Sequence, residues 1–164
     1  MRSGCPAKYA SHTPVLIDCT CSGLQHIAAI IGDPALGAAV NLTSSTVKED
    51  LYELMAQRVQ GMASRSTGVV MDRNMIKKVI MTIPYNATIS TSAGYLLDNF
   101  RSVGGSYYAT SDRNLTKPLQ FKDIYNMAKM IHKSFFKRHH AVDDLVRYFS
   151  EIGHLLAVLQ IPIR

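Results

Sequence analysis

The chain has 164 residues, of which 47% are hydrophobic and 18% are charged, with a formal net charge of +6. This composition is too apolar for an intrinsically disordered protein, and the length suits one globular domain of ordinary size. No stretch reaches the roughly 20 apolar residues of a membrane helix, and no apolar signal-peptide core follows Met1. We therefore expect a soluble, non-secreted protein with no membrane partner.

The positive charge is concentrated in the C-terminal part of the sequence. Residues 1–72 carry a net charge of −1, whereas the segment from Arg73 onward carries +7. Such an excess is typical of a segment that faces a polyanion, either a nucleic acid or a nucleoside triphosphate. A solvated helix face would give the same composition, so charge alone leaves both interpretations open.

One strand and one helix are expected first along the chain. Residues 13–17 are apolar and β-branched behind a proline, which is typical of a strand that ends at Asp18. Thr20 and Ser22 are candidate caps for a helix over residues 23–31.

The rest of the sequence is predicted to be mostly helical. A capping box of Thr46 and Glu49 predicts the start of a helix that ends near Ser64. The next helix, over residues 72–83, must end or kink at Pro84, because proline lacks the N–H donor and clashes with the preceding turn. Further expected elements are a polar loop over 86–94, a short helix over 96–100, a Gly/Ser loop near 104–105, and helices over 122–136 and 141–160.

Asp18 is the first candidate functional residue, because it follows an apolar strand directly. An unpaired carboxylate in such a setting is costly, so Asp18 needs a partner. A divalent metal ion is one possible partner, and a backbone cap or an ion pair with Arg or Lys is another. The residue types around Asp18 leave all of these open.

A second candidate site repeats every four residues along the helix expected at 72–83. Each four-residue step on a helix turns by about 40°, so Arg73, Lys77 and Met81 share one face. Arg binds phosphate oxygens in a bidentate way, Lys supplies a mobile charge, and Tyr85 at the far end offers a ring for a sugar or base. This pattern suits a nucleoside triphosphate along the helix, and a solvated cationic face is the alternative.

These two stretches, in this order, resemble one polymerase family. Motif A of the single-subunit, phage-type DNA-dependent RNA polymerases, D-G-S-C-S/N-G-x-Q-H, is similar to the run DCTCSGLQH at residues 18–26. Motif B of the same family, R-x-x-x-K-[RK]-x-x-M-T-x-x-Y-G, resembles residues 73–85. Residues 39–42 and 50–52 also match the family at compatible spacing. The family includes the mitochondrial and chloroplast enzymes.

The resemblance implies an α/β but predominantly helical fold, made of part of a polymerase palm strand and the fingers helices of the right-hand polymerase fold. Residues 1–34 would form the palm-like strand, turn and helix, and residues 35–164 the fingers-like helical region. The implied localisation is mitochondrial. The Pro-Tyr-Asn sequence at residues 84–86 looks like the polymerases carried by linear plasmids of fungal and plant mitochondria.

The resemblance also implies a catalytic metal site and a reaction. Asp18 would hold Mg²⁺ together with the backbone carbonyl of Cys19, and Lys77 would take part in catalysis. The implied reaction is attack of the RNA 3′-OH on the α-phosphorus of a nucleotide. The implied partners are a DNA template, the RNA product, ribonucleoside triphosphates and, beyond these, transcription factors or missing polymerase segments.

The same resemblance implies the residues that bind the nucleotide. Arg73 and Lys77 would contact the triphosphate. Tyr85 would sense the ribose 2′-OH and so favour ribonucleotides, and Tyr52 would line the nucleotide entry site.

Three departures from the family pattern bear on mechanism. Cys19 stands where the family has Gly, and Asn86 follows Tyr85 in place of Gly, although Asn also tolerates the left-handed backbone region. The second metal aspartate of the family lies in a His-Asp-Ser-like motif C beyond motif B, and this sequence has no His-Asp dipeptide. We therefore expect a truncated fragment that is inactive alone. The alternatives are a non-catalytic, basic nucleic-acid-binding remnant of the same fold and a fragment of a related DNA polymerase.

Overall fold

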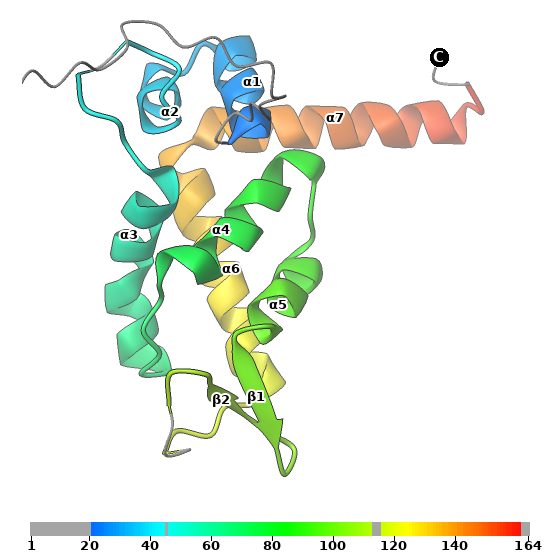
Figure 1. Ribbon diagram of the computed structural model, residues 1–164. Coiled ribbons are helices and arrows are strands. Elements are labelled where there is room, and N and C mark those ends of the chain that lie inside the picture. Colours follow the sequence, from blue (N-terminus) through cyan, green and yellow to red (C-terminus); the bar gives the residue numbers. More distant parts are fainter. Residues whose placement is uncertain (1–20, 45, 113–115, 162–164) are drawn as a thin grey trace, which may run out of the picture.

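The computed structural model describes residues 21–44, 46–112 and 116–161. Within these ranges the chain forms seven α-helices, one 3-10 helix and one two-stranded antiparallel sheet (Figure 1). The strand expected over residues 13–17, with Asp18 at its end, lies outside them. The elements are α1 (Ser22–Ile31), α2 (Pro34–Ala39), α3 (Leu51–Ser66), α4 (Arg73–Thr82), η1 (Ile83–Tyr85), α5 (Ile89–Leu97), β1 (Phe100–Val103), β2 (Ser106–Ala109), α6 (Phe121–Arg138) and α7 (His140–Val158).

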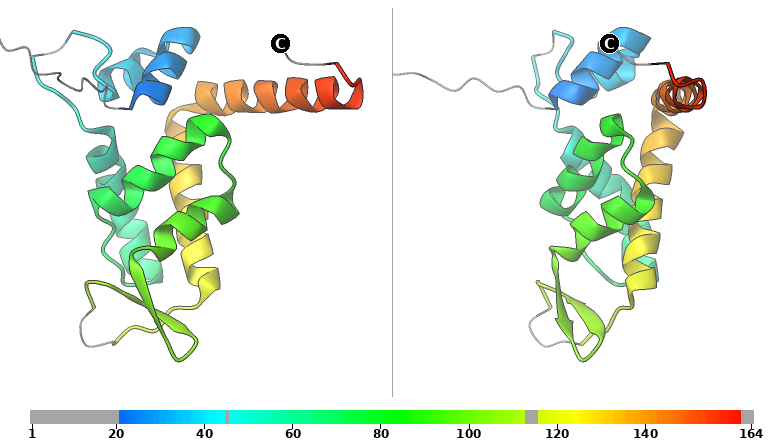
Figure 2. Two further views of the ribbon diagram at one scale, coloured as in Figure 1. Left: turned by 45° about the vertical axis from the view of Figure 1, so that its right-hand side comes forward. Right: turned by 90° about the vertical axis from the view of Figure 1, so that its right-hand side faces the viewer.

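Four helices form the body of the molecule. α6 packs against α3, α4 and α5, and α4 lies between α3 and α5 (Figures 1 and 2). α1 and α2 pack together at one end of this body, where α1 also contacts η1 and the start of α7. The hairpin of β1 and β2 lies at the opposite end, and α7 extends sideways from the body.

The start of α3 differs from the capping box that the sequence predicts. Asp50 is the N-cap, and its Oδ1 accepts hydrogen bonds from the N–H groups of Tyr52 and Glu53. The predicted capping box of Thr46 and Glu49 is wrong, because the backbone of Glu49 forms hydrogen bonds with the side chain of Asn41 instead. The Asn41 amide donates to the Glu49 carbonyl at 2.7 Å and accepts from its N–H at 2.8 Å.

The first helix begins one residue earlier than expected and has no side-chain cap. Cys21 is its N-cap, with φ 61°, and its side chain makes no capping hydrogen bond. Ser22 lies inside the helix, so its expected capping role is wrong, and Thr20 lies outside the described residues. The end of α1 at Ile31 is as predicted.

The helix that carries the four-residue repeat ends where Pro84 requires. α4 runs from Arg73 to Thr82 and is capped by Asp72, whose side chain accepts from the Met75 N–H. The chain then tightens into η1, and Asn86 follows with φ 57°. The predicted kink before Tyr85 is confirmed.

The predictions for residues 89–100 are wrong, although residues 86–88 are non-helical as expected. The polar stretch forms α5 over Ile89–Leu97, and the backbone N–H of Thr91 donates to its N-cap, Thr88. Small buried residues let α5 lie close to α6, where Ser92 Oγ is 2.8 Å from His132 Nε2. In place of the expected short helix over 96–100, the chain completes α5, turns at residues 98–99 and enters β1, which turns into β2 through two glycines with positive φ.

The core lies where α4, α5 and α6 meet, and the apolar face that the sequence predicts for the helix over 122–136 supplies its α6 side chains. The two C-terminal helices are confirmed, with α6 and α7 separated by the buried His139. The described part of the chain is thus mostly helical with a small antiparallel sheet. No helix in that part is both long and apolar enough to cross a membrane. Fully buried core residues include Ile76, Val79, Ile80, Leu96, Ile124 and Phe135.

Candidate functional site

The N-terminal ends of α1, α3 and α4 meet at a group of four side chains, Cys21, Asp50, Tyr52 and Arg73, which we call the Tyr52 cluster. Arg73 Nε donates to Asp50 Oδ2 at 2.5 Å, and its guanidinium carbon lies 5.4 Å from the centre of the Tyr52 ring. The Cys21 thiol donates to the Tyr52 hydroxyl at 2.8 Å. The hydroxyl of Tyr52 thus contacts Cys21 and its ring faces Arg73, and these two contacts hold the side chain in one orientation.

The ionisation states in the Tyr52 cluster follow from burial and from the Asp50–Arg73 pair. Burial raises the pKa of the Tyr52 hydroxyl well above its ordinary value and also raises the pKa of the Cys21 thiol. Burial opposes ionisation of Asp50, but the hydrogen bonds from Arg73 and from the Glu53 N–H outweigh it and lower the pKa of this carboxyl. The cluster therefore contains one carboxylate, one guanidinium and two protonated neutral groups.

A cavity of about 110 Å³ opens beside the Tyr52 cluster, and both predicted tyrosines line it together with Met81. Tyr85 is 75% exposed, whereas Tyr52 is buried. α1 approaches η1 closely at Gly23, where a Cβ atom would lie 3.3 Å from the Tyr85 hydroxyl and 3.4 Å from Pro84 Cβ. A glycine at this position thus brings α1 into contact with η1.

A larger hollow of about 590 Å³ shares Cys21 and Tyr52 with this cavity and includes Arg73 and Lys48 in its wall. Two side chains, those of Gln25 and Asn41, form hydrogen bonds to the backbone and hold the segments that line this hollow. Gln25 Nε2 donates to the Val40 carbonyl at 2.7 Å, and Asn41 holds the loop before α3. The segments at residues 39–42 and 50–52, which match the family in sequence, are therefore adjacent in space.

The structure brings together most of the predicted nucleotide-binding residues. Tyr52, Arg73 and Tyr85 line the two adjacent hollows, and Lys77 lies exposed on α4 one turn after Arg73. Arg73 and Met81, which share one face of α4, line these hollows together with Cys21, so α4 presents this face to the start of α1. The sequence predicts that Arg73 is free to bind phosphate, but in the structure Arg73 is paired with Asp50.

The predicted metal site lies outside the described residues, because Asp18 and Cys19 precede Cys21 by three and two positions. Within the described ranges, no group of three or more His, Cys, Asp or Glu side chains is arranged to hold a metal ion. Asp50 is engaged by Arg73 and by the first turn of α3. The carboxylate and carbonyl oxygens expected at positions 18 and 19 are of the type that Mg²⁺ prefers.

Sequence reasoning missed two features around this site. It assigned Asp50 no role, although an acidic residue just before an apolar helix is a recognisable cap signal. It also missed the link between Asn86 and Ser150, whose side chains are 2.8 Å apart and join the turn after Tyr85 to α7. The second link joins residues 64 positions apart, so local pattern could not indicate it.

Comparison with known proteins assigns the chain to a family. The family model for DNA-dependent RNA polymerase matches residues 1–159. The chain belongs to this family. It is 31% identical to a probable DNA-directed RNA polymerase of Neurospora crassa, over 94% of the chain and 20% of that protein. It is 37% identical to the human mitochondrial DNA-directed RNA polymerase, over 54% of the chain and 8% of that protein.

A probable DNA-directed RNA polymerase of Agaricus bitorquis is 29% identical over 92% of the chain and 15% of that protein. The chain thus spans about a fifth or less of the length of these relatives. The resemblance to phage-type RNA polymerases that the sequence motifs indicate is confirmed.

Proposed function

We propose that this chain supplies the nucleotide-binding part of a DNA-directed RNA polymerase, which transfers ribonucleotides to a growing RNA under the direction of a DNA template. One observation carries the proposal. Tyr52, Arg73 and Tyr85, each matched to the family from sequence, line two adjacent hollows between α1, α3 and α4. An aromatic wall beside a cationic helix face suits a nucleoside triphosphate.

The side chains take separate roles in this proposal. Lys77 and Arg73 bind the triphosphate, and a bound phosphate competes with Asp50 for the Arg73 guanidinium. Tyr52 lines the entry to the site, held by Cys21 and Arg73. Tyr85, exposed at the far end of α4, contacts the ribose and favours a 2′-hydroxyl.

The reaction class follows from the family. The RNA 3′-OH loses its proton to solvent as its oxygen forms a bond to the α-phosphorus, the bond from that phosphorus to the oxygen bridging to the β-phosphate breaks, and pyrophosphate leaves. We propose that Asp18 and the Cys19 carbonyl hold Mg²⁺, which when bound stabilises negative charge on the phosphates. Lys77 would neutralise charge on the leaving phosphates.

The wider setting is also proposed from the relatives. Residues 1–34 would belong to a palm and residues 35–164 to the fingers of a right-hand polymerase. The segments that the relatives possess beyond this match would supply a second metal aspartate. Mitochondrial localisation, with a gene on the main genome or on a linear plasmid, fits the mammalian and fungal relatives.

The test is a polymerase reconstituted around this segment. Asp18→Asn should abolish nearly all nucleotide incorporation, while Asp98→Asn, which removes an exposed carboxylate paired with Lys78, should leave incorporation unchanged. Tyr85→Phe should weaken the preference for ribonucleotides over deoxyribonucleotides, whereas Tyr148→Phe on α7 should not. Full activity in the Asp18→Asn enzyme would show that the metal assignment is wrong. Salt-dependent DNA binding without any Mg²⁺-dependent nucleotide affinity would instead support the non-catalytic remnant.

A further inference from the structure

The solvent face of α6 carries four lysines and an asparagine, and we call this row the lysine stripe. All five side chains are exposed, and at 100° per residue they fall within an arc of about 80°. The opposite face of α6 is buried against α3, α4 and α5, so the fold fixes the direction in which the stripe points. The stripe consists of Lys122, Asn126, Lys129, Lys133 and Lys137.

Within the described ranges, no ion pair involves a lysine of the stripe. The ion pairs join Asp50 to Arg73, Asp98 to Lys78 and Asp144 to Arg147, and Asp33 lies near His139. The one acidic residue of α6, Asp123, accepts the N–H of Gln120 in the capping box. The positive charge of the stripe therefore has no counter-charge from a described salt bridge.

The spacing of the stripe places like charges next to one another. Lys129, Lys133 and Lys137 follow one another at i,i+4, where like charges repel and destabilise a helix that has no counter-charge. The helix macrodipole favours Lys137 near the C-terminal end of α6 but disfavours Lys122 in the first turn. An external polyanion accounts for all four lysines together.

We propose that the lysine stripe binds the phosphate backbone of duplex DNA. This inference rests on the proposed function for the identity of the polyanion, a DNA template. The stripe from Lys122 to Lys137 is about 22 Å long at 1.5 Å per residue, which corresponds to about six base-pair steps. Its five exposed members carry no ring, and the aromatic side chains that border it on α6, Tyr125 and Phe136, are half-buried, which leaves little surface for stacking single-strand bases.

The position of the stripe separates it from the nucleotide site. Figure 2 shows α6 along one side of the body, with α3 and α4 on the other side. The Tyr52 cluster lies between α1, α3 and α4, whereas the stripe points away from these helices. A duplex bound to the stripe would therefore leave the nucleotide hollows open. In this proposal α6 holds the template and takes no part in the reaction.

The experiment measures binding of the full chain to a labelled DNA duplex by fluorescence anisotropy over a series of salt concentrations, without nucleotide or Mg²⁺. Each phosphate contact contributes about −0.9 to the slope of log K against log salt. Replacing Lys122, Lys129, Lys133 and Lys137 with Gln should make the slope shallower by about 3.6. Replacing the same four lysines with Arg should keep the slope, and circular dichroism confirms that each variant is folded.

A matched control removes the same charge from other exposed positions. Gln at Arg58, Arg65, Arg101 and Lys117 should change the slope far less, because these side chains lie outside α6 and outside the nucleotide hollows. An equal change in this control would overturn the proposal, since binding would then follow net charge alone. Tighter binding of single-stranded DNA or polyglutamate than of duplex by the stripe would also overturn it. A polymerase that stays active with Asp18→Asn would count against the proposed function and leave this result unaffected.

Discussion

The side-chain amide of Asn86 donates to Ser150 Oγ at 2.8 Å and so joins the turn after Tyr85 to the middle of α7. Asn86 also has φ 57°, a backbone conformation that Gly and Asn tolerate far better than other residues. The residue that departs from the family pattern thus keeps the left-handed turn and adds a side-chain link that glycine could not make.

The first prediction separates these two roles of Asn86. Asn86→Gly should lose the link but keep the backbone, whereas Asn86→Ala loses the link and meets strain of about 1 kcal/mol at positive φ. The free energy of unfolding in urea should therefore be lower for Asn86→Ala than for Asn86→Gly. Ser150→Ala is the control, since it removes the link without backbone strain and should cost about 0.5–1 kcal/mol. An Ala variant as stable as the Gly variant would contradict this account.

The second prediction concerns Asp50, which caps α3 and pairs with Arg73. Asp50→Ala should destabilise the chain by about 1 kcal/mol through the lost cap, and Asp50→Asn by less, because Asn also caps helices. Both variants free Arg73, so both should bind a nucleoside triphosphate more tightly than the wild-type chain, as measured by titration calorimetry. Weaker triphosphate binding would show that Asp50 assists the site.

The pH dependence of the same pair has a definite sign. The folded state lowers the pKa of Asp50, so the stabilisation is present above the ordinary carboxyl value of 3.8 and is lost as the pH falls through the folded value. Asp50→Asn should therefore flatten part of the loss of stability below about pH 4. Asp33 also has a lowered pKa in the folded state, so the Asp50→Asn variant should still lose some stability as the pH falls over this range.

The sequence predicted those elements whose signals are local. The break at Pro84, the two long C-terminal helices and the four-residue repeat of α4 each depend on neighbours within a turn or two. The stretch at residues 86–94 was predicted as a loop because it is polar, yet tertiary packing decides it. Ser92 and Ala93 are fully buried against α6, which stabilises a helix that propensity alone would not indicate.

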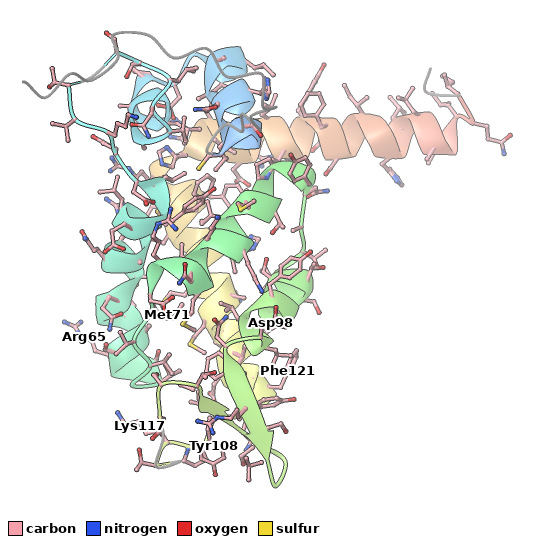
Figure 3. All side chains as sticks on the ribbon, in the orientation of Figure 1. Arg65, Met71, Asp98, Tyr108, Lys117 and Phe121 are labelled. Carbon is pink, nitrogen blue, oxygen red and sulfur yellow. The ribbon has the colours of Figure 1, made fainter. Side chains whose placement is uncertain are left out.

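The candidate site shows the same limit. Tyr52, Arg73 and Tyr85 could be selected by motif, but the partner of Arg73 could not, since Asp50 lies 23 positions earlier in the chain. The hairpin was also missed, because strands of four residues leave little periodic signal. Figure 3 labels Tyr108 on this hairpin, at the end of the molecule remote from α1.

The third prediction tests the buried link between α5 and α6. Ser92→Ala leaves His132 Nε2 without its partner at 2.8 Å, and an unsatisfied buried group costs about 1–3 kcal/mol. Thermal and urea unfolding should both show this loss. Ser90→Ala, at an exposed position of the same helix, should leave stability unchanged or slightly raised. Equal effects of the two changes would mean that helix propensity, and not the hydrogen bond, sets the result.

The last prediction concerns His139, which is fully buried where α6 meets α7. Its Nδ1 lies 3.5 Å from Asp33 Oδ2, and neither ring nitrogen has a hydrogen-bond partner among the described residues. Burial lowers the pKa of His139 and outweighs the opposing effect of Asp33. The folded state therefore keeps the ring neutral at pH values where the unfolded chain already binds a proton.

Stability should consequently fall as the pH drops below the ordinary histidine value of 6.5, by at most about 1.4 kcal/mol per pH unit for this group. His139→Phe, which preserves the contact with the Phe135 ring, should flatten the curve of unfolding free energy between about pH 7 and 5. His132 also has a lowered pKa, so some slope should persist until it too is replaced. His140→Gln, at the exposed neighbouring position, is the matched control and should leave the curve unchanged. An undiminished slope in the His139→Phe variant would assign the acid sensitivity to another group.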